Sequence, residues 1–331
     1  MIETRTLGRA GPQVSAIGLG CMAMSGMYGP ADRAQAIATI HAALEAGITL
    51  LDTGDFYGMG HNELLIAEAL SGVPRHTYQL SVKFGAMRDR AGGWVGYDAR
   101  PAAVRNFLAY SLERLGVEYI DIYRPARLDP EVPIEETVGA IAECVARGWV
   151  RHIGLSEVGA ATLRRASAVN PICDLQIEYA LVTRGIEADI LPACRELGIG
   201  VTAYGVLSRG LIGGSWQPGG SGGGDFRAHS PRFHADNAAG NLAVAERIAA
   251  IARSAGLSGA QLAIAWVAAQ GPDIVPLVGA RRPERIAEAV AAVEAEFGAD
   301  VLEALAAAVP PGALAGERYA PHAMASLDSE S

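Results

Sequence analysis

Eight short apolar runs alternate with longer amphipathic segments along most of the chain. The runs lie at residues 15–19, 48–52, 78–83, 119–123, 150–155, 173–177, 200–204 and 274–278. This alternation is typical of a parallel sheet covered by helices, and eight strand-helix units in one chain close best as a barrel. The sequence therefore predicts an α/β fold, a single (β/α)8 TIM barrel domain over residues 1–331. An open doubly wound sheet is the alternative, but no Gly-x-Gly-x-x-Gly follows the first run.

The segments between the runs carry helix signals. Pro101 begins and Gly116 follows the segment 101–115, the usual asymmetry of helix ends. Further helices are expected at residues 31–46, 62–70, 134–147, 160–169, 187–197 and 283–297.

Two glycine-containing connections lack periodicity. Residues 84–97 are long enough to form a pocket wall, and residues 205–240 make a long loop after strand 7, with glycines at 219, 220 and 222–224. Such a loop could close over a bound ligand, although a plain flexible insertion explains residues 215–230 nearly as well. The last residues, 324–331, are expected to be a disordered tail.

Charge and cysteine usage narrow the class of protein. A net charge of −9 without a Lys/Arg cluster argues against nucleic acid or an anionic membrane as partner. The chain has neither a signal-peptide pattern nor an apolar run near the ~20 residues of a membrane span. Its four cysteines, Cys21, Cys144, Cys173 and Cys194, show no paired spacing and fit reduced thiols. We therefore expect a cytoplasmic protein, monomeric or weakly oligomeric, that acts on a small molecule without a metal.

Three polar residues with complementary chemistry follow neighbouring strands. Asp52 and Lys83 each end an apolar run, and Tyr57 follows Asp52 after a turn that begins at Gly54. The carboxyl ends of barrel strands meet at one face, so we expect the three to converge. An ammonium lowers the pKa of a nearby phenol, and a carboxylate keeps that ammonium charged. The trio therefore predicts that Tyr57 transfers a proton to or from an oxygen atom of a substrate. The carbon attached to that oxygen would gain or lose a hydride. Alternatively, the three are ordinary turn, loop and surface residues.

Several segments around this trio match one known family. LDTGDFYG at 51–58 continues with Gly60, Asn62 and Glu63, and further matches are TLGR at 6–9, LGCM at 19–22, SVK at 81–83, LERLG at 112–116, YIDIY at 119–123, residues 148–156 and AY at 203–204. Together they resemble the aldo-keto reductases up to about residue 300. The resemblance implies a TIM barrel with an N-terminal β-hairpin and a nicotinamide cofactor, and it implies Asp52, Tyr57 and Lys83 as catalytic residues.

The resemblance also implies how a cofactor binds. Ser156 and Gln176 would hold the nicotinamide carboxamide, and Tyr204 would stack on the ring, although Glu157 follows Ser156 where the family usually has Asn. Arg281 and Arg285 match positions that grip an adenosine 2′-phosphate, which favours NADP(H) over NAD. The full cofactor set is Gly20, Met22, Asp52, Ser156, Gln176, Tyr204, Gly205, Leu207, Arg209, Leu211, Gly279, Arg281, Arg285 and Glu288.

One position departs from the family in the substrate pocket. Many aldo-keto reductases place a His after the fourth strand, where this chain has Ala126. Loss of one oriented donor typically costs about 10²-fold or more in rate. Arg124 or Arg127 could take over the donor role, the larger pocket could admit a bulkier substrate, or carbonyl activity could be weak; we favour the larger pocket. Its expected walls are Phe56, Phe84, Trp94, Tyr123 and Ala126, with the chain around Tyr319.

The resulting hypothesis is an NADP(H)-dependent oxidoreductase that moves hydride between nicotinamide and a carbonyl or alcohol carbon. Tyr57 would be the general acid or base, Lys83 its pKa tuner and Asp52 the partner of Lys83. The alternatives are a cofactor-binding regulatory subunit with little turnover, as in channel-associated members of the fold, and a purely structural barrel.

Overall fold

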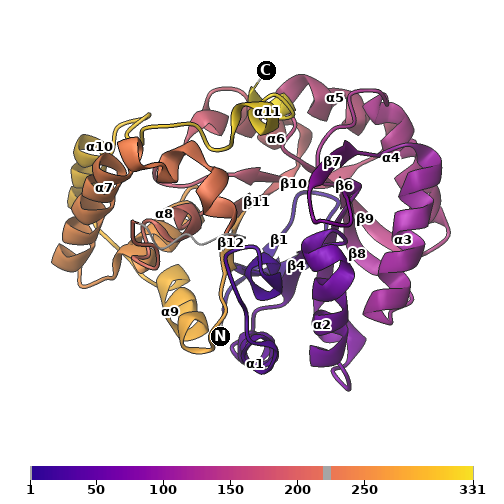
Figure 1. Cartoon of the computed structure of the whole chain (residues 1–331), viewed down its shortest axis with the longest axis horizontal. Coiled ribbons are helices and arrows are strands. Elements are labelled where there is room, and N and C mark those ends of the chain that lie inside the picture. Colours follow the sequence, from indigo (N-terminus) through magenta and orange to yellow (C-terminus); the bar gives the residue numbers. More distant parts are fainter. Residues whose placement is uncertain (1, 219–224, 331) are drawn as a thin grey trace.

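Eight parallel strands form a closed barrel with helices outside it (Figure 1). The computed structural model describes residues 2–218 and 225–330, so the predicted glycine run at 219–224 lies outside the described residues. In barrel order the strands are β3 (Gly18–Gly20), β4 (Leu50–Gly54), β5 (Gln79–Phe84), β8 (Ile120–Pro125), β9 (Val150–Ser156), β10 (Ile172–Glu178), β11 (Gly200–Tyr204) and β12 (Ile274–Gly279). The predicted TIM barrel is confirmed.

Eleven α-helices lie in the described part of the chain. They are α1 (Arg33–Glu45), α2 (His61–Ala69), α3 (Pro101–Leu115), α4 (Ile134–Ala146), α5 (Ala160–Val169), α6 (Ile190–Leu197), α7 (Ala235–Ser254), α8 (Gly259–Ala268), α9 (Glu284–Val293), α10 (Ala299–Ala308) and α11 (Pro321–Met324). The sequence did not predict α7, α8, α10 or α11. Their alanine-rich faces give weak periodicity, although Ser258 and Gln261 form a capping box at the start of α8.

Two small hairpins flank the barrel at its ends. β1 (Thr4–Thr6) and β2 (Gln13–Ser15) form the predicted N-terminal hairpin. The turn of that hairpin approaches the barrel closely at Gly8, where a Cβ would lie 2.2 Å from the carbonyl oxygen of Cys173. β6 (Ala86–Arg88) and β7 (Trp94–Tyr97) pair within the connection after β5, so the predicted irregular wall is an antiparallel hairpin.

The carboxyl-terminal segment runs from α10 back to α11 (Figure 1). The backbone N–H of Gly159 donates to Asp328 Oδ2 at 2.7 Å, and the Ser329 hydroxyl donates to Glu157 Oε2 at 2.7 Å. Residues 324–330 therefore differ from the disordered tail that we expected, because these polar contacts hold them on the loop after β9.

No single helix among the described residues is long and apolar enough to cross a membrane. The bent pair α7 and α8 meets the criteria of length and composition taken together. Most of α8 is buried, with Leu262, Ile264 and Val267 in the core.

A buried carboxyl group follows β4. Asp55 is 8% exposed, and its Oδ2 has no hydrogen-bond partner among the described residues. Burial, with a smaller contribution from Glu63, raises the pKa of Asp55 to about 8. Since the ordinary aspartate pKa is ~3.9, the folded protein holds a proton here that the unfolded chain has lost.

Asp55→Asn is expected to remove this pH dependence. The contribution of Asp55 to stability is fully present below pH ~4 and is lost as the pH rises through about 8, because ionisation is easier in the unfolded chain. Relative to its difference from wild type at pH 4.5, the variant should therefore gain about 4–5 kcal/mol in free energy of unfolding at pH 8.5. Urea unfolding between pH 4.5 and 8.5 measures the difference, and Glu246→Gln on the exposed face of α7 is the control. Parallel pH curves for wild type and Asp55→Asn would contradict the prediction.

Candidate active site

A cavity of about 1200 Å³ lies at the carboxyl ends of the barrel strands. It exceeds the usual range for small-molecule pockets, and active sites of this fold lie at this face. The structure places most of the predicted site residues on its wall: Gly20, Met22, Asp52, Phe56, Tyr57, Lys83, Trp94, Ala126, Ser156, Gln176, Tyr204, Gly205, Leu207, Arg209, Gly279, Arg281, Arg285 and Glu288.

Asp52 and Lys83 form a buried ion pair at the base of this cavity. The Asp52 carboxylate also accepts hydrogen bonds from Ser81 Oγ and Gln176 Nε2, each at 2.7 Å. Burial lowers the pKa of Lys83, and the charge of Asp52 partly reverses that change. The Asp52 carboxylate is thus held by Ser81 and Lys83 of β5 and by Gln176 of β10, and these three contacts fix its position.

Tyr57 lies directly beside this ion pair. The ammonium of Lys83 is 5.1 Å from the centroid of the Tyr57 ring, and the ring packs edge-on against Phe56 at 4.8 Å. Burial, followed by the charge of Asp52, raises the pKa of Tyr57 well above its ordinary value, while Arg127 lowers it. We expected a lowered pKa. In the protein alone, burial outweighs the nearby cations, so the Tyr57 hydroxyl is protonated at neutral pH.

A strained turn presents Tyr57 to the cavity. Gly58, Met59 and Gly60 all have positive φ, at 56°, 54° and 93°, a region that glycine adopts readily and methionine does not. Asn62 secures the turn: its side-chain amide accepts from Thr53 Oγ1 at 2.6 Å and donates to the Cys21 carbonyl at 2.9 Å. This local network explains the sequence pattern that follows Asp52.

The two candidate donors near Ala126 have different environments. Arg124 is fully buried inside the barrel, pairs with Asp174 at 2.9 Å and donates to Ser81 Oγ at 2.9 Å. Arg127 lines the cavity and donates to the Ser156 hydroxyl at 3.4 Å and the Tyr319 hydroxyl at 3.3 Å. Arg124 is therefore a structural cation, and Arg127 is the cation that faces the cavity.

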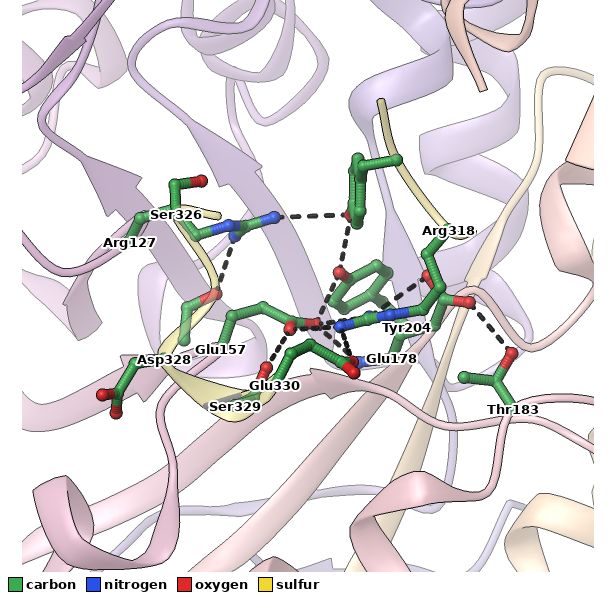
Figure 2. A network of polar contacts seen from close by, with 12 residues as sticks. Arg127, Glu157, Glu178, Thr183, Tyr204, Arg318, Ser326, Asp328, Ser329 and Glu330 are labelled. Carbon is green, nitrogen blue, oxygen red and sulfur yellow. Dashed lines mark hydrogen bonds and ion pairs between the residues drawn. The ribbon is translucent and has the colours of Figure 1, made fainter. Parts of the chain in front are cut away.

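Glu157 organises a polar network at the cavity mouth (Figure 2). Its carboxylate accepts from the Tyr204 hydroxyl at 2.6 Å, from Arg318 at 2.8 and 3.1 Å and from Ser329 Oγ at 2.7 Å. The backbone N–H of Glu178 donates to it as well, at 3.0 Å. Glu157 is fully buried and has a positive φ of 52°. The carboxylate that replaces the family Asn therefore fixes the tyrosine predicted to stack on nicotinamide.

The sequence reasoning missed Arg318 as part of this site. A buried carboxylate requires a cation or several donors, so Glu157 was a signal that a partner exists. Nothing in the sequence pattern identified that partner, because Arg318 follows the last predicted helix in an aperiodic segment.

The opposite end of the cavity is basic. Arg281 donates to the backbone carbonyl of Pro30 at 3.1 Å, while Arg285 pairs with Glu288 at 2.7 Å near the start of α9. A Cβ built on Gly279 would meet nothing closer than 3.8 Å. Open glycine backbone, a helix N-terminus and two guanidiniums are a suitable environment for phosphate groups. Arg282 also lines this end.

Three predicted site residues, two pocket walls and one cofactor contact, lie outside the cavity lining. Phe84 and Tyr123 stack on each other at 4.4 Å, fully buried, and the Tyr123 hydroxyl donates to the Val104 carbonyl of α3. They point outward from the barrel because Lys83, the neighbour of Phe84, points inward and strand side chains alternate. Leu211, predicted to contact the cofactor, packs in the hydrophobic core instead.

Known proteins are similar to this chain in sequence and in structure. The model of the Aldo/keto reductase family matches residues 16–310. A Glycine max protein named probable aldo-keto reductase 1 is 42% identical over 323 residues, which cover 96% of this chain and 92% of that protein.

Solved structures superpose over nearly the whole chain. The glycerol dehydrogenase of Gluconobacter oxydans has a TM-score of 0.82 and 31% identity, covering 93% of this chain and 96% of that one. An aldo-keto reductase from Klebsiella pneumoniae, solved in complex with NADPH, has a TM-score of 0.73 and 28% identity, covering 94% and 96%. The chain therefore belongs to the aldo/keto reductase family, an oxidoreductase family with the TIM barrel fold.

Proposed function

We propose that this protein is an NADP(H)-dependent oxidoreductase that interconverts a small aldehyde or ketone and its alcohol. The observation that carries the proposal is the buried Asp52–Lys83 ion pair beside Tyr57 in a cavity that extends to a basic helix N-terminus. Family membership supports the same class of reaction.

The roles of the three residues follow from their environments. Bound nicotinamide supplies the hydride in reduction and accepts it in oxidation. Tyr57 donates its hydroxyl proton to the oxygen of the carbonyl that is reduced, and takes a proton back in the reverse direction. The ammonium of Lys83 stabilises the phenolate that remains, and Asp52 holds Lys83 in place. One hydride and one proton are transferred for each carbonyl reduced.

The cofactor proposal rests on residues at both ends of the cavity. Arg281 and Arg285 would bind the 2′-phosphate, and Gly279 would leave room for the other phosphate groups of the cofactor. Ser156 and Gln176 would hold the carboxamide, and Tyr204 would stack on the ring. The NADPH complex of the Klebsiella pneumoniae relative supports the choice of NADP(H) over NAD.

Consumption and binding of NADPH test this proposal. Wild type should oxidise NADPH, followed at its absorbance, with members of a panel of aromatic aldehydes, α-diketones and cyclic ketones. Arg285→Ala is expected to weaken NADPH binding by about 10-fold or more, the usual effect of one charge-assisted contact, and to leave NADH binding unchanged. NADPH binding without turnover in either direction would favour the regulatory alternative. Equal losses for both cofactors would contradict the role of Arg285.

A further inference from the structure

Arg127 is a cavity-facing cation without a carboxylate partner. Its guanidinium donates to the Ala126 carbonyl at 2.6 Å, to Ser156 Oγ at 3.4 Å and to the Tyr319 hydroxyl at 3.3 Å, all neutral acceptors. Within residues 2–218 and 225–330, no ion pair involves Arg127. A guanidinium has five N–H donors and stays charged, so Arg127 retains capacity to bind an anion.

The neighbouring carboxylates make their direct ion pairs with other arginines, not with Arg127. We use the name mouth cluster for Arg127, Arg209, Arg232, Arg318, Glu157, Glu178 and Glu330. In the mouth cluster Arg209 and Arg232 pair with Glu178 at 3.5 and 3.0 Å, and Arg318 pairs with all three glutamates. Tyr319 links Arg127 to Glu157 through Tyr204, since the Tyr319 hydroxyl lies 2.7 Å from that of Tyr204, which donates to Glu157. Four guanidiniums thus face three carboxylates, and Arg127 is the one with no carboxylate in direct contact, although Glu157 acts on it electrostatically at longer range.

The position of Arg127 separates it from the proton donor. Its contact with Ser156 places the guanidinium toward β9, whereas Lys83 lies on β5, on the other side of β8. The side chain of Ala126, between them, is only a methyl group and leaves cavity space there. Arg127 nevertheless acts on Tyr57 electrostatically. One small molecule can therefore contact Tyr57 with one group and Arg127 with another.

We propose that Arg127 binds a carboxylate of the substrate, so that the protein acts on aldehydes or ketones that carry a carboxylate a few bonds from the carbonyl. This inference rests on the proposed carbonyl chemistry and names its substrate class. The fork of a guanidinium matches the two oxygens of a carboxylate. A single cation with no carboxylate in direct contact suits a singly charged group, and neutral tyrosine hydroxyls around it do not repel an anion.

A pair of matched substrates tests the inference. For wild type, kcat/KM for 4-formylbenzoate should exceed that for its methyl ester, and Arg127→Gln should lower the acid-to-ester ratio by roughly 10- to 100-fold, the usual effect of a hydrogen bond to a charged group. Arg127→Lys should keep part of the preference, because it retains the charge without the fork. Arg90→Gln, an exposed arginine outside the cavity lining, is the charge-matched control and should keep the wild-type ratio.

Two outcomes would overturn the role of Arg127, and they differ from failure of the proposed function. If wild type reduces the ester with NADPH but shows no preference for the acid, the function stands and the inference is wrong. If Arg127→Gln lowers both rates equally, Arg127 acts on the reacting carbonyl and not on a carboxylate. If neither substrate is reduced, the proposed function fails on this pair. Calorimetric titration of benzoate into the NADP⁺-treated protein then decides the inference: binding that weakens at least 10-fold in Arg127→Gln supports it, and equal or absent binding overturns it.

Discussion

Tyr57→Phe is expected to lower kcat for carbonyl reduction by about 10²- to 10⁴-fold, the usual contribution of a positioned general acid. The substitution removes only the hydroxyl, so the edge-on contact with Phe56 and the position of the ring below Lys83 should persist. The Asp52–Lys83 ion pair does not involve the hydroxyl and should also remain. NADPH affinity should therefore stay within a few-fold of wild type while turnover falls.

Two measurements distinguish loss of the proton donor from damage to the fold. NADPH binding, measured by fluorescence titration, reports the cofactor site, and steady-state kinetics report turnover. Tyr110→Phe removes the same hydroxyl from a tyrosine on α3 that is 57% exposed, and should match wild type in both. A Tyr57→Phe protein with more than a third of wild-type kcat would exclude Tyr57 as the general acid. A variant that lost NADPH binding and turnover together would indicate a structural role.

The barrel was predictable because its strands are encoded locally. Each buried strand is an apolar run of strand length, and the runs alternate with helix signals. Convergence of Asp52, Tyr57 and Lys83 followed from topology alone, since carboxyl ends of barrel strands meet at one face. The same alternation that turns Lys83 inward turns Phe84 outward, so the misplacement of Phe84 and Tyr123 was avoidable. β5 and β8 pair Val82 with Tyr123 and Lys83 with Arg124.

The mouth of the cavity was not predictable in the same way. Glu157 and Arg318 are 161 residues apart, and Arg318 belongs to no periodic segment. Contacts between a loop and a terminal segment depend on three-dimensional packing. Hydrophobic periodicity reports only local secondary structure, so it does not predict them. The buried carboxylate signalled only that a partner was required. The sequence also did not show that Arg127 faces the cavity while Arg124 is buried inside the barrel, because the two arginines lie three residues apart with no pattern to distinguish them.

Arg318→Gln is expected to destabilise the protein by about 3–5 kcal/mol, the usual cost of removing one partner of a buried ion pair. Arg318 is 4% exposed, and Glu157 is fully buried with no other guanidinium in ion-pair contact among the described residues. Glu178 is less affected, since Arg209 and Arg232 still pair with it. Urea unfolding at pH 7 measures the change, and Arg164→Gln, from an exposed pair with Glu196, should cost little.

The pH dependence of this loss identifies its electrostatic origin. Burial by itself would raise the pKa of Glu157, but Arg318 and Arg127 hold it well below its ordinary value. A depressed carboxyl pKa contributes stability that is present above the unfolded pKa of ~4.3 and is lost as the pH falls below it. The difference between wild type and Arg318→Gln should therefore shrink between pH 5 and pH 3.5. In the double variant Glu157→Gln/Arg318→Gln, the loss should be smaller than the sum of the two single losses, because no charge is left buried alone. A difference that is constant with pH, together with additive losses, would mean that Arg318 stabilises the protein through packing and not through its charge.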